Sequence, residues 1–148
     1  MALNFNQFAA EGNTFMKEYA KQMNLGNDTN KAGRILSSVL HAFRDVISNQ
    51  ESLQLIAQLP MFLKAVYVNG WTNHKTKKVR TMTDFIKLVR KYDGLTASQD
   101  FETDELTENY IDTTFILLRQ YISLGELEDL RSSLPKELKS IVYNNVMF

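Results

Sequence analysis

The 148-residue chain has no cysteine, which excludes disulfides, thiolate metal sites and cysteine nucleophiles. It also lacks a long hydrophobic run, because no segment approaches the roughly 20 apolar residues that a membrane span requires. The N-terminal residues Met1–Phe5 carry neither the basic region nor the apolar run of a secretory signal. We therefore expect a cytoplasmic protein without a membrane segment.

The motifs of common enzyme classes are absent as well. There is no Gly-rich phosphate loop, no Gly-x-Ser-x-Gly turn and no His-Glu-x-x-His pair. The two histidines, His41 and His74, leave little to bind a transition metal. His41 stands two residues from Val39 and from Phe43, about 200° around a helix from each, which predicts a surface or boundary position. The sequence thus predicts no catalytic residue, no cofactor and no metal.

A net charge is absent too, since 17 basic residues balance 17 acidic ones. The charges are unevenly placed, because basic residues gather in 71–80 while acidic residues exceed basic ones in 81–148. A protein with this balance is not a general coat for nucleic acid. We therefore do not expect nucleic acid to be its main partner.

One stretch of sequence occurs twice, 75 residues apart. Aligning 35–68 with 110–143 gives nine identical pairs in 34 positions, where composition alone gives about two or three. Most of the pairs are apolar or capping positions, so they indicate a repeated folding unit and contain no reaction chemistry. The nine pairs are Arg44/Arg119, Ile47/Ile122, Ser48/Ser123, Glu51/Glu126, Leu55/Leu130, Leu59/Leu134, Pro60/Pro135, Leu63/Leu138 and Lys64/Lys139.

Both copies carry the same signals for starting and breaking a helix. Ser48 and Ser123 are each followed three residues later by Glu, and in this pattern each side chain bonds the other residue's free backbone N–H. Pro60 and Pro135 follow within the dipeptide Leu-Pro, where proline ends one helix and suits the first position of the next. Each copy therefore contains two short helices in succession.

Apolar residues recur with helical spacing along the rest of the chain. The pattern predicts a helix over about 4–23, a long helix over 29–47 with a broad apolar stripe, and a helix ending at Asp93. A loop is predicted over 95–103, and another long helix begins near Thr103. No segment alternates with period two for long enough to indicate a strand.

These signals predict an all-α fold of two tandem four-helix repeats packed as one compact helical bundle. With 44% hydrophobic residues, the chain has the size of one domain and can bury about two-thirds of its unfolded surface. The predicted divisions are a first helical repeat over 1–70, a basic connector over 71–82 and a second helical repeat over 83–148.

The paired Leu-Pro elements resemble those of a known bacterial family. The residues that carry the resemblance are Gln58-Leu59-Pro60 with Leu63, Tyr67, Gly70-Trp71, the basic linker into Asp84-Phe85, and Leu134-Pro135-Lys136-Glu137-Leu138. On these residues the chain is similar, from about Phe15 to Tyr143, to the family catalogued as domain of unknown function 2267. It departs from the pattern at Ser132-Ser133 and in a longer acidic lead-in to its second half. The resemblance implies a duplicated all-helical fold in the bacterial cytoplasm, and it assigns no functional residue.

The connector has the pattern most like a binding site. A cationic strand beside an aromatic ring can hold phosphates and stack on a base. The alternative is a solubilising strap between the halves, with Trp71 buried between them. The candidate contact residues are Trp71, His74, Lys75, Lys77, Lys78 and Arg80.

Asp104, Glu108 and Asp112 form a second candidate surface, an acidic helix face. They fall at i, i+4 and i+8, where like charges repel one another. Such repulsion favours a basic partner or a loosely held divalent cation, although the alternating ligands and glycine of a calcium loop are missing. The alternative is a solvated helix face.

Three hypotheses for the function remain. The first is a non-catalytic interaction or scaffold module that binds an unknown protein, or itself, through the groove between the repeats or through the charged surfaces. The second is a carrier of a small-molecule or lipid-like ligand in an apolar cavity between the repeats. The third is weak nucleic-acid binding through the connector, and enzymatic activity comes last.

Overall fold

The computed structural model of this protein describes residues 3–72 and 76–143. Within those ranges the chain forms helices and no strand, which confirms the all-α prediction. None of the helices found there combines the length and apolarity needed to cross a bilayer. The elements are α1 (Phe5–Gln22), α2 (Thr29–Val46), α3 (Asn49–Ile56), α4 (Met61–Val68), α5 (Met82–Asp93), η1 (Gly94–Thr96), α6 (Ala97–Asp100), α7 (Asp104–Leu118), η2 (Arg119–Tyr121), α8 (Leu124–Ser133), η3 (Lys136–Leu138) and α9 (Lys139–Val142), where η marks a 3₁₀ turn.

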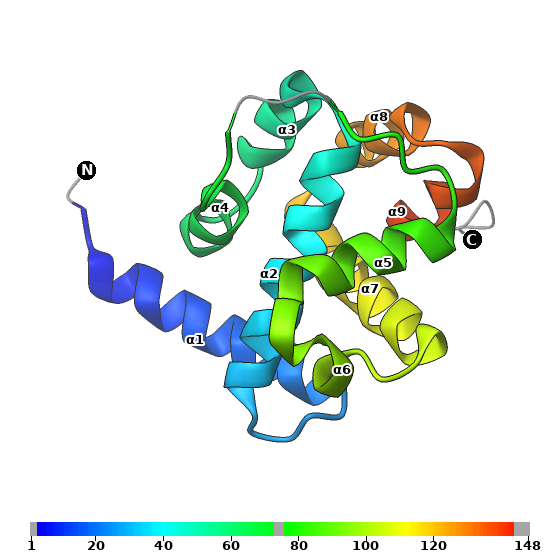
Figure 1. Cartoon of the computed structure of the whole chain (residues 1–148). Coiled ribbons are helices and arrows are strands. Elements are labelled where there is room, and N and C mark those ends of the chain that lie inside the picture. The colour runs from blue at the N-terminus through cyan, green and yellow to red at the C-terminus, as the bar shows by residue number, and fades with distance from the viewer. Residues whose placement is uncertain (1–2, 73–75, 144–148) are drawn as a thin grey trace.

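Helix α2 runs through the middle of the molecule (Figure 1). It packs against α1 and α4 from the first half of the chain and against α5, α6 and α7 from the second half. Its buried apolar residues Ala32, Ile35, Val39, Phe43 and Val46 follow one another at steps of three or four, which places them on one broad helix face. Helix α1 in turn touches α7, so the helices of the two halves interlock in one body.

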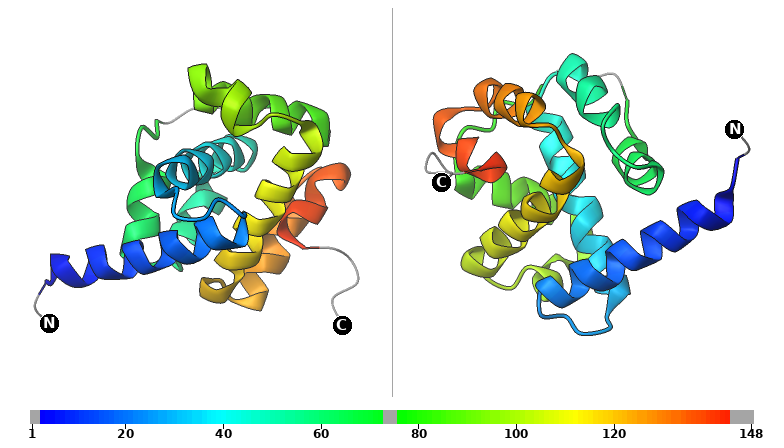
Figure 2. Two further views of the ribbon diagram at one scale, coloured as in Figure 1. Left: turned by 90° about the horizontal axis from the view of Figure 1, so that it is seen from below. Right: turned by 180° about the vertical axis from the view of Figure 1, so that it is seen from behind.

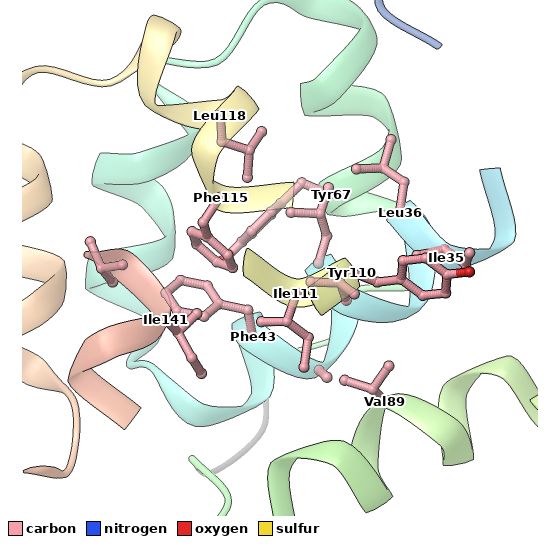
Figure 3. Packing of buried hydrophobic residues seen from close by; sticks show 14 of the residues in the cluster. Ile35, Leu36, Phe43, Tyr67, Val89, Tyr110, Ile111, Phe115, Leu118 and Ile141 are labelled. Carbon is pink, nitrogen blue, oxygen red and sulfur yellow. The ribbon is translucent and has the colours of Figure 1, made fainter. Parts of the chain in front are cut away.

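A single cluster of buried apolar side chains joins helices of both halves. Its centre contains Phe43 of α2 and Phe115 of α7 (Figure 3), whose ring centroids are 4.8 Å apart in an edge-to-face contact. A buried hydrogen bond of 2.6 Å also joins the Tyr19 hydroxyl of α1 to Thr114 Oγ1 of α7. Because the Thr114 hydroxyl donates its proton to Tyr110 O at 2.7 Å, Tyr19 is the donor.

The predicted helix caps at Ser48 and Ser123 are present, but the reciprocal bond from the serine N–H to the glutamate side chain is found in neither half of the described chain. Each serine hydroxyl accepts from the backbone N–H three residues on, at 3.1 Å from Glu51 and 3.2 Å from Glu126. The backbone N–H of Ser123, however, donates to the side-chain oxygen of Gln58 at 2.7 Å rather than to Glu126. The prediction is wrong there because a residue from the other half supplies the acceptor.

The repeated arginines Arg44 and Arg119 hold the end of a helix in each half. Arg44 Nη1 donates to Tyr67 O at 2.6 Å and to Asn69 O at 2.7 Å, at the C-terminus of α4. Arg119 Nε donates to Val142 O at 2.8 Å, at the C-terminus of α9. The last carbonyls of a helix have no intrahelical donor, so each arginine satisfies groups that would otherwise be unpaired. The duplication itself stays a prediction from the sequence.

Two predicted segments differ from the structure. Leu95–Thr103, predicted as a loop, contains η1 and α6. An ion pair anchors this segment to α2, because Arg34 contacts Asp100 through Nε at 2.8 Å and through Nη2 at 3.0 Å. Such a long-range contact leaves no local pattern in the sequence. The helix predicted after Pro135 is instead divided into η3 and the short α9.

Asp93, at the end of α5, lies beside the Asp100 carboxylate. Burial and a hydrogen bond to Asp100 raise the pKa of Asp93 to about 6. Hydrogen bonds from Arg34 lower the pKa of Asp100. Asp93 Oδ2 is buried and has no hydrogen-bond partner in the part of the chain that the structure describes. Because Arg34 keeps Asp100 ionised, Asp93 is the member of the pair that becomes protonated and donates to Asp100.

This pair makes the stability of the protein depend on pH. The folded protein keeps the Asp93 proton to a higher pH than the unfolded chain does, so ionisation between about pH 4 and pH 6 removes stability. We expect Asp93→Asn to be more stable than wild type at neutral pH by about 1 kcal/mol, because solvent screens a half-buried carboxylate. The difference should shrink as the pH falls through that window.

Urea denaturation followed by circular dichroism at a series of pH values measures this difference. Asp129→Asn, the same chemical change at an exposed site on α8, is the matched control. A constant offset between Asp93→Asn and wild type at all pH values would contradict the raised pKa.

Candidate functional site

The described part of the connector is fastened to α2 through Lys77. The Lys77 backbone N–H donates to Asp45 O at 2.8 Å, and Lys77 Nζ lies 3.1 Å from Asp45 Oδ2. The same ammonium lies 5.7 Å from the centre of the Tyr92 ring. His74 and Lys75 of the candidate set lie outside the described residues. The charge of Lys77 is therefore paired with Asp45 within the protein.

Lys77 contacts a buried polar cluster on α2. Asp45 is only 2% exposed and accepts a hydrogen bond of 2.5 Å from the Tyr92 hydroxyl. Burial and Asp45 raise the pKa of Tyr92 to about 12, so Tyr92 stays a donor. The Lys77 ammonium and the Tyr92 hydroxyl thus both contact Oδ2 of this buried carboxylate, which needs such partners.

His41 belongs to the same region, and it is buried where the sequence predicted a surface or boundary position. The side chain is buried, its ring lies edge-on to Tyr92 at 5.8 Å, and Nε2 lies 2.7 Å from Val66 O of α4. Burial lowers the pKa of His41, so Nε2 is the protonated atom of a neutral ring and donates to the carbonyl. The helical angle placed His41 off the apolar stripe correctly, but α4 packs over that side of α2.

The remaining connector residues have other surroundings. Trp71 is half-buried with its ring edge-on to Tyr67 of α4 at 6.4 Å, and its indole N–H has no hydrogen-bond partner among the described residues. Lys78 and Arg80 are exposed. Within the described residues, then, Lys77 and Trp71 contact α2 and α4 rather than forming one open cationic surface.

The negative charge of the acidic face on α7 is partly neutralised by an arginine. Asp104 Oδ1 accepts from Arg90 Nη1 at 2.7 Å. Glu108 is exposed, and burial together with the Glu108 charge raises the pKa of Asp112. No group of three or more His, Cys, Asp or Glu side chains in residues 3–72 and 76–143 is arranged to hold a metal ion.

An open hollow of about 620 Å³ lies where helices of the two halves meet, and we call it the α1–α7 groove. Helix α1 forms one wall, α7 with η2 the other, and α4 closes one side. The residues that define the groove are Glu11, Phe15, Glu18, Phe62, Leu117 and Tyr121.

Three aromatic rings form the floor of the α1–α7 groove. The Phe15 ring centroid lies 5.4 Å from that of Phe62 and 6.3 Å from that of Tyr121, and Phe62 and Tyr121 are also 6.3 Å apart. The rings therefore touch one another and make a continuous apolar surface. Gly12 permits this arrangement, because a Cβ there would lie 3.2 Å from Phe62 Cβ and push α1 away from α4.

The rim of the α1–α7 groove is acidic. Glu11 and Glu18 are exposed and seven residues apart on α1, so they project from the same side of the helix. No Lys or Arg from the described part of the chain lines the groove. Burial and the nearby Glu11 charge raise the pKa of Tyr121, which keeps this floor residue neutral.

The family model described as "Uncharacterized conserved protein (DUF2267)" matches residues 12–141. The chain belongs to the DUF2267 family. This finding confirms the predicted family. A search of curated proteins gave no significant match.

The DUF2267 match contains nearly all of the α1–α7 groove, because Phe15, Glu18, Phe62 and Tyr121 lie inside it. The first turns of α1 precede the match and extend away from the body (Figures 1 and 2). Phe5 in these turns is 72% exposed. The conformation of this end of α1 leaves its apolar residues without a covering helix.

The sequence predicted a groove between the repeats, but it did not identify the residues that line the α1–α7 groove of this DUF2267 protein. Phe15, Phe62 and Tyr121 lie far apart in the chain and meet only when α1, α4 and η2 pack together. The one local signal was the i, i+7 spacing of Glu11 and Glu18 on a helix whose other exposed residues are mixed. That spacing alone does not distinguish a rim from an ordinary solvated face.

Proposed function

We propose that this DUF2267 protein is a non-catalytic module of the bacterial cytoplasm that binds another protein through the α1–α7 groove. The observation that carries the proposal is the hollow over Phe62 and Tyr121, whose rings are partly exposed between walls from both halves and pack against the buried Phe15. Each apolar side chain of Leu or Phe size that became buried on this floor would contribute about 1.5–3 kcal/mol. Grooves between helices are a common place for a partner's apolar side chains.

A small-molecule or lipid-like ligand is the second candidate, because a hollow of about 620 Å³ falls within the range of small-molecule sites. The rings of the floor pack against one another, however, so a small ligand would lie on them with one side in water. On such an open site, a longer polypeptide can bury more apolar surface than a compact ligand can. Nucleic-acid binding draws less support, since Lys77 is paired with Asp45.

A photo-cross-linking amino acid placed in the groove tests the proposal. Thr14 and Gln120 line opposite walls and are exposed, so either can carry the cross-linker without disturbing the core. We expect both positions to give the same protein adduct in the native host, because one partner would touch both walls. Mass spectrometry identifies the adduct.

Ser98 on α6 and Lys87 on α5 are matched control positions, since both are exposed and outside the groove. Adducts that appear equally from the control positions would contradict the proposal. An adduct of small-molecule mass at Thr14 and Gln120 would favour the second candidate.

A further inference from the structure

We infer that the occupant of the α1–α7 groove is an amphipathic helix of another protein, with Lys or Arg flanking its apolar face. The inference rests on the proposed function and adds the chemistry of the partner. It draws on the charge of the rim, the nature of the walls and the composition of the chain's own exposed segments.

Within residues 3–72 and 76–143, no ion pair is found for either carboxylate of the rim. Gln7 Nε2 donates to Glu11 Oε1 at 3.0 Å, and Gln22 Nε2 donates to Glu18 Oε1 at 2.8 Å. Both glutamines lie on α1 itself and are uncharged, so these hydrogen bonds hold the two carboxylates along one helix without neutralising them. A partner that brings cations to this rim gains two ion pairs, and one that brings carboxylates is repelled.

The walls favour a helix over an extended strand. Every wall is helical, so its backbone groups already bond within the helices and no strand edge is available for pairing. Glu11 and Glu18 are separated by about 10 Å along α1, from a rise of about 1.5 Å per residue. A partner helix lying beside α1 can match this separation with cations two turns apart while its apolar side chains face Phe15 and Phe62.

The apolar end of α1 in a second copy of this chain lacks the cations that the rim favours. The exposed apolar end of α1, from Leu3 to Phe8, contains no Lys or Arg and leaves the rim charges unpaired. Lys77 in the described connector is already bound to Asp45. A small quaternary ammonium ion does not fit the groove, because the floor rings touch one another and leave no cage between them.

A phage-displayed library of short helical peptides, selected against the whole protein, tests the inference. We expect the enriched peptides to carry more Lys and Arg than Asp and Glu beside a stripe of apolar residues. An enriched peptide should bind the double variant Glu11→Gln/Glu18→Gln about fivefold more weakly at low salt, as two exposed ion pairs imply. The difference should disappear at high salt.

Two comparison proteins give the selection its controls. Glu105→Gln/Glu108→Gln makes the same charge change at exposed positions of α7 outside the groove and should bind like wild type. Thr14→Trp fills the groove from an exposed position and should abolish binding. Thermal unfolding of each variant establishes that it is folded.

The outcomes separate the inference from the function on which it rests. Neutral or acidic peptides that lose binding with Thr14→Trp but not with Glu11→Gln/Glu18→Gln would overturn the inference and keep the groove as a protein site. Tightest binding by a peptide of residues 1–16 of this chain would make a second copy the occupant and also overturn it. A failure to enrich any peptide over the Thr14→Trp protein would overturn both.

Discussion

Replacing Phe43 with alanine is expected to lower the free energy of unfolding by about 3–5 kcal/mol. Phe43 is fully buried on α2, and its ring contacts Phe115 of α7 at a centroid distance of 4.8 Å. The change removes apolar surface from the core and leaves a cavity between the two helices that join the halves. Urea denaturation followed by circular dichroism measures the loss, and the melting temperature should fall by about 10 °C.

Phe5→Ala is the matched control for this prediction. It deletes the same atoms at a residue that is 72% exposed at the free end of α1, so the stability should change by less than about 0.5 kcal/mol. Equal effects of the two substitutions would mean that α2 and α7 do not pack through Phe43.

Replacing Arg44 with methionine is expected to cost about 3 kcal/mol, although methionine keeps much of the side-chain volume. The reason is that Tyr67 O and Asn69 O lose a charged donor and have no other donor from α4 itself. Arg44 is 4% exposed, so water cannot easily replace the guanidinium. Arg44→Lys should lose less, because a lysine keeps the charge but lacks the planar fork that reaches both carbonyls.

Thermal and urea unfolding of these variants, with Arg80→Met as control, measures the contribution of Arg44. Arg80 is exposed on the connector, so its replacement should alter stability by less than about 0.5 kcal/mol. If Arg44→Met were as stable as wild type, the end of α4 would not depend on this arginine.

The parts of the fold that could be predicted are those whose causes are local. Ser48 and Ser123 cap helices through atoms three residues away, and the apolar stripe of 29–47 is visible from spacing alone. The starts of α2 and α7 follow from the same kind of signal, since Asp28 and Thr103 each accept a bond from the N–H three residues on. Such signals depend on residues close together in the sequence, so they can be identified without knowing how the helices pack.

The parts that could not be predicted depend on helices that are distant in the chain. The repeat showed that Arg44 and Arg119 occupy equivalent positions, but it could not show that Arg44 donates to the carbonyls at the end of α4. His41 was placed by its angle on α2, but the packing of α4 decides its burial. The segment before α7 becomes helical because Arg34 of α2 binds Asp100. The candidate site has the same origin, since the groove exists only where α1, α4 and η2 meet.

The interlocking of the halves bears on how such a chain can arise. Helix α5 packs on α2, and α1 packs on α7, so the first helix of either half is covered partly by the long helix of the other. If the 75-residue spacing records a gene duplication, an ancestral single unit would have left that helix face bare. In such an ancestor, an identical neighbour would have been needed to cover that face as the other half covers it here.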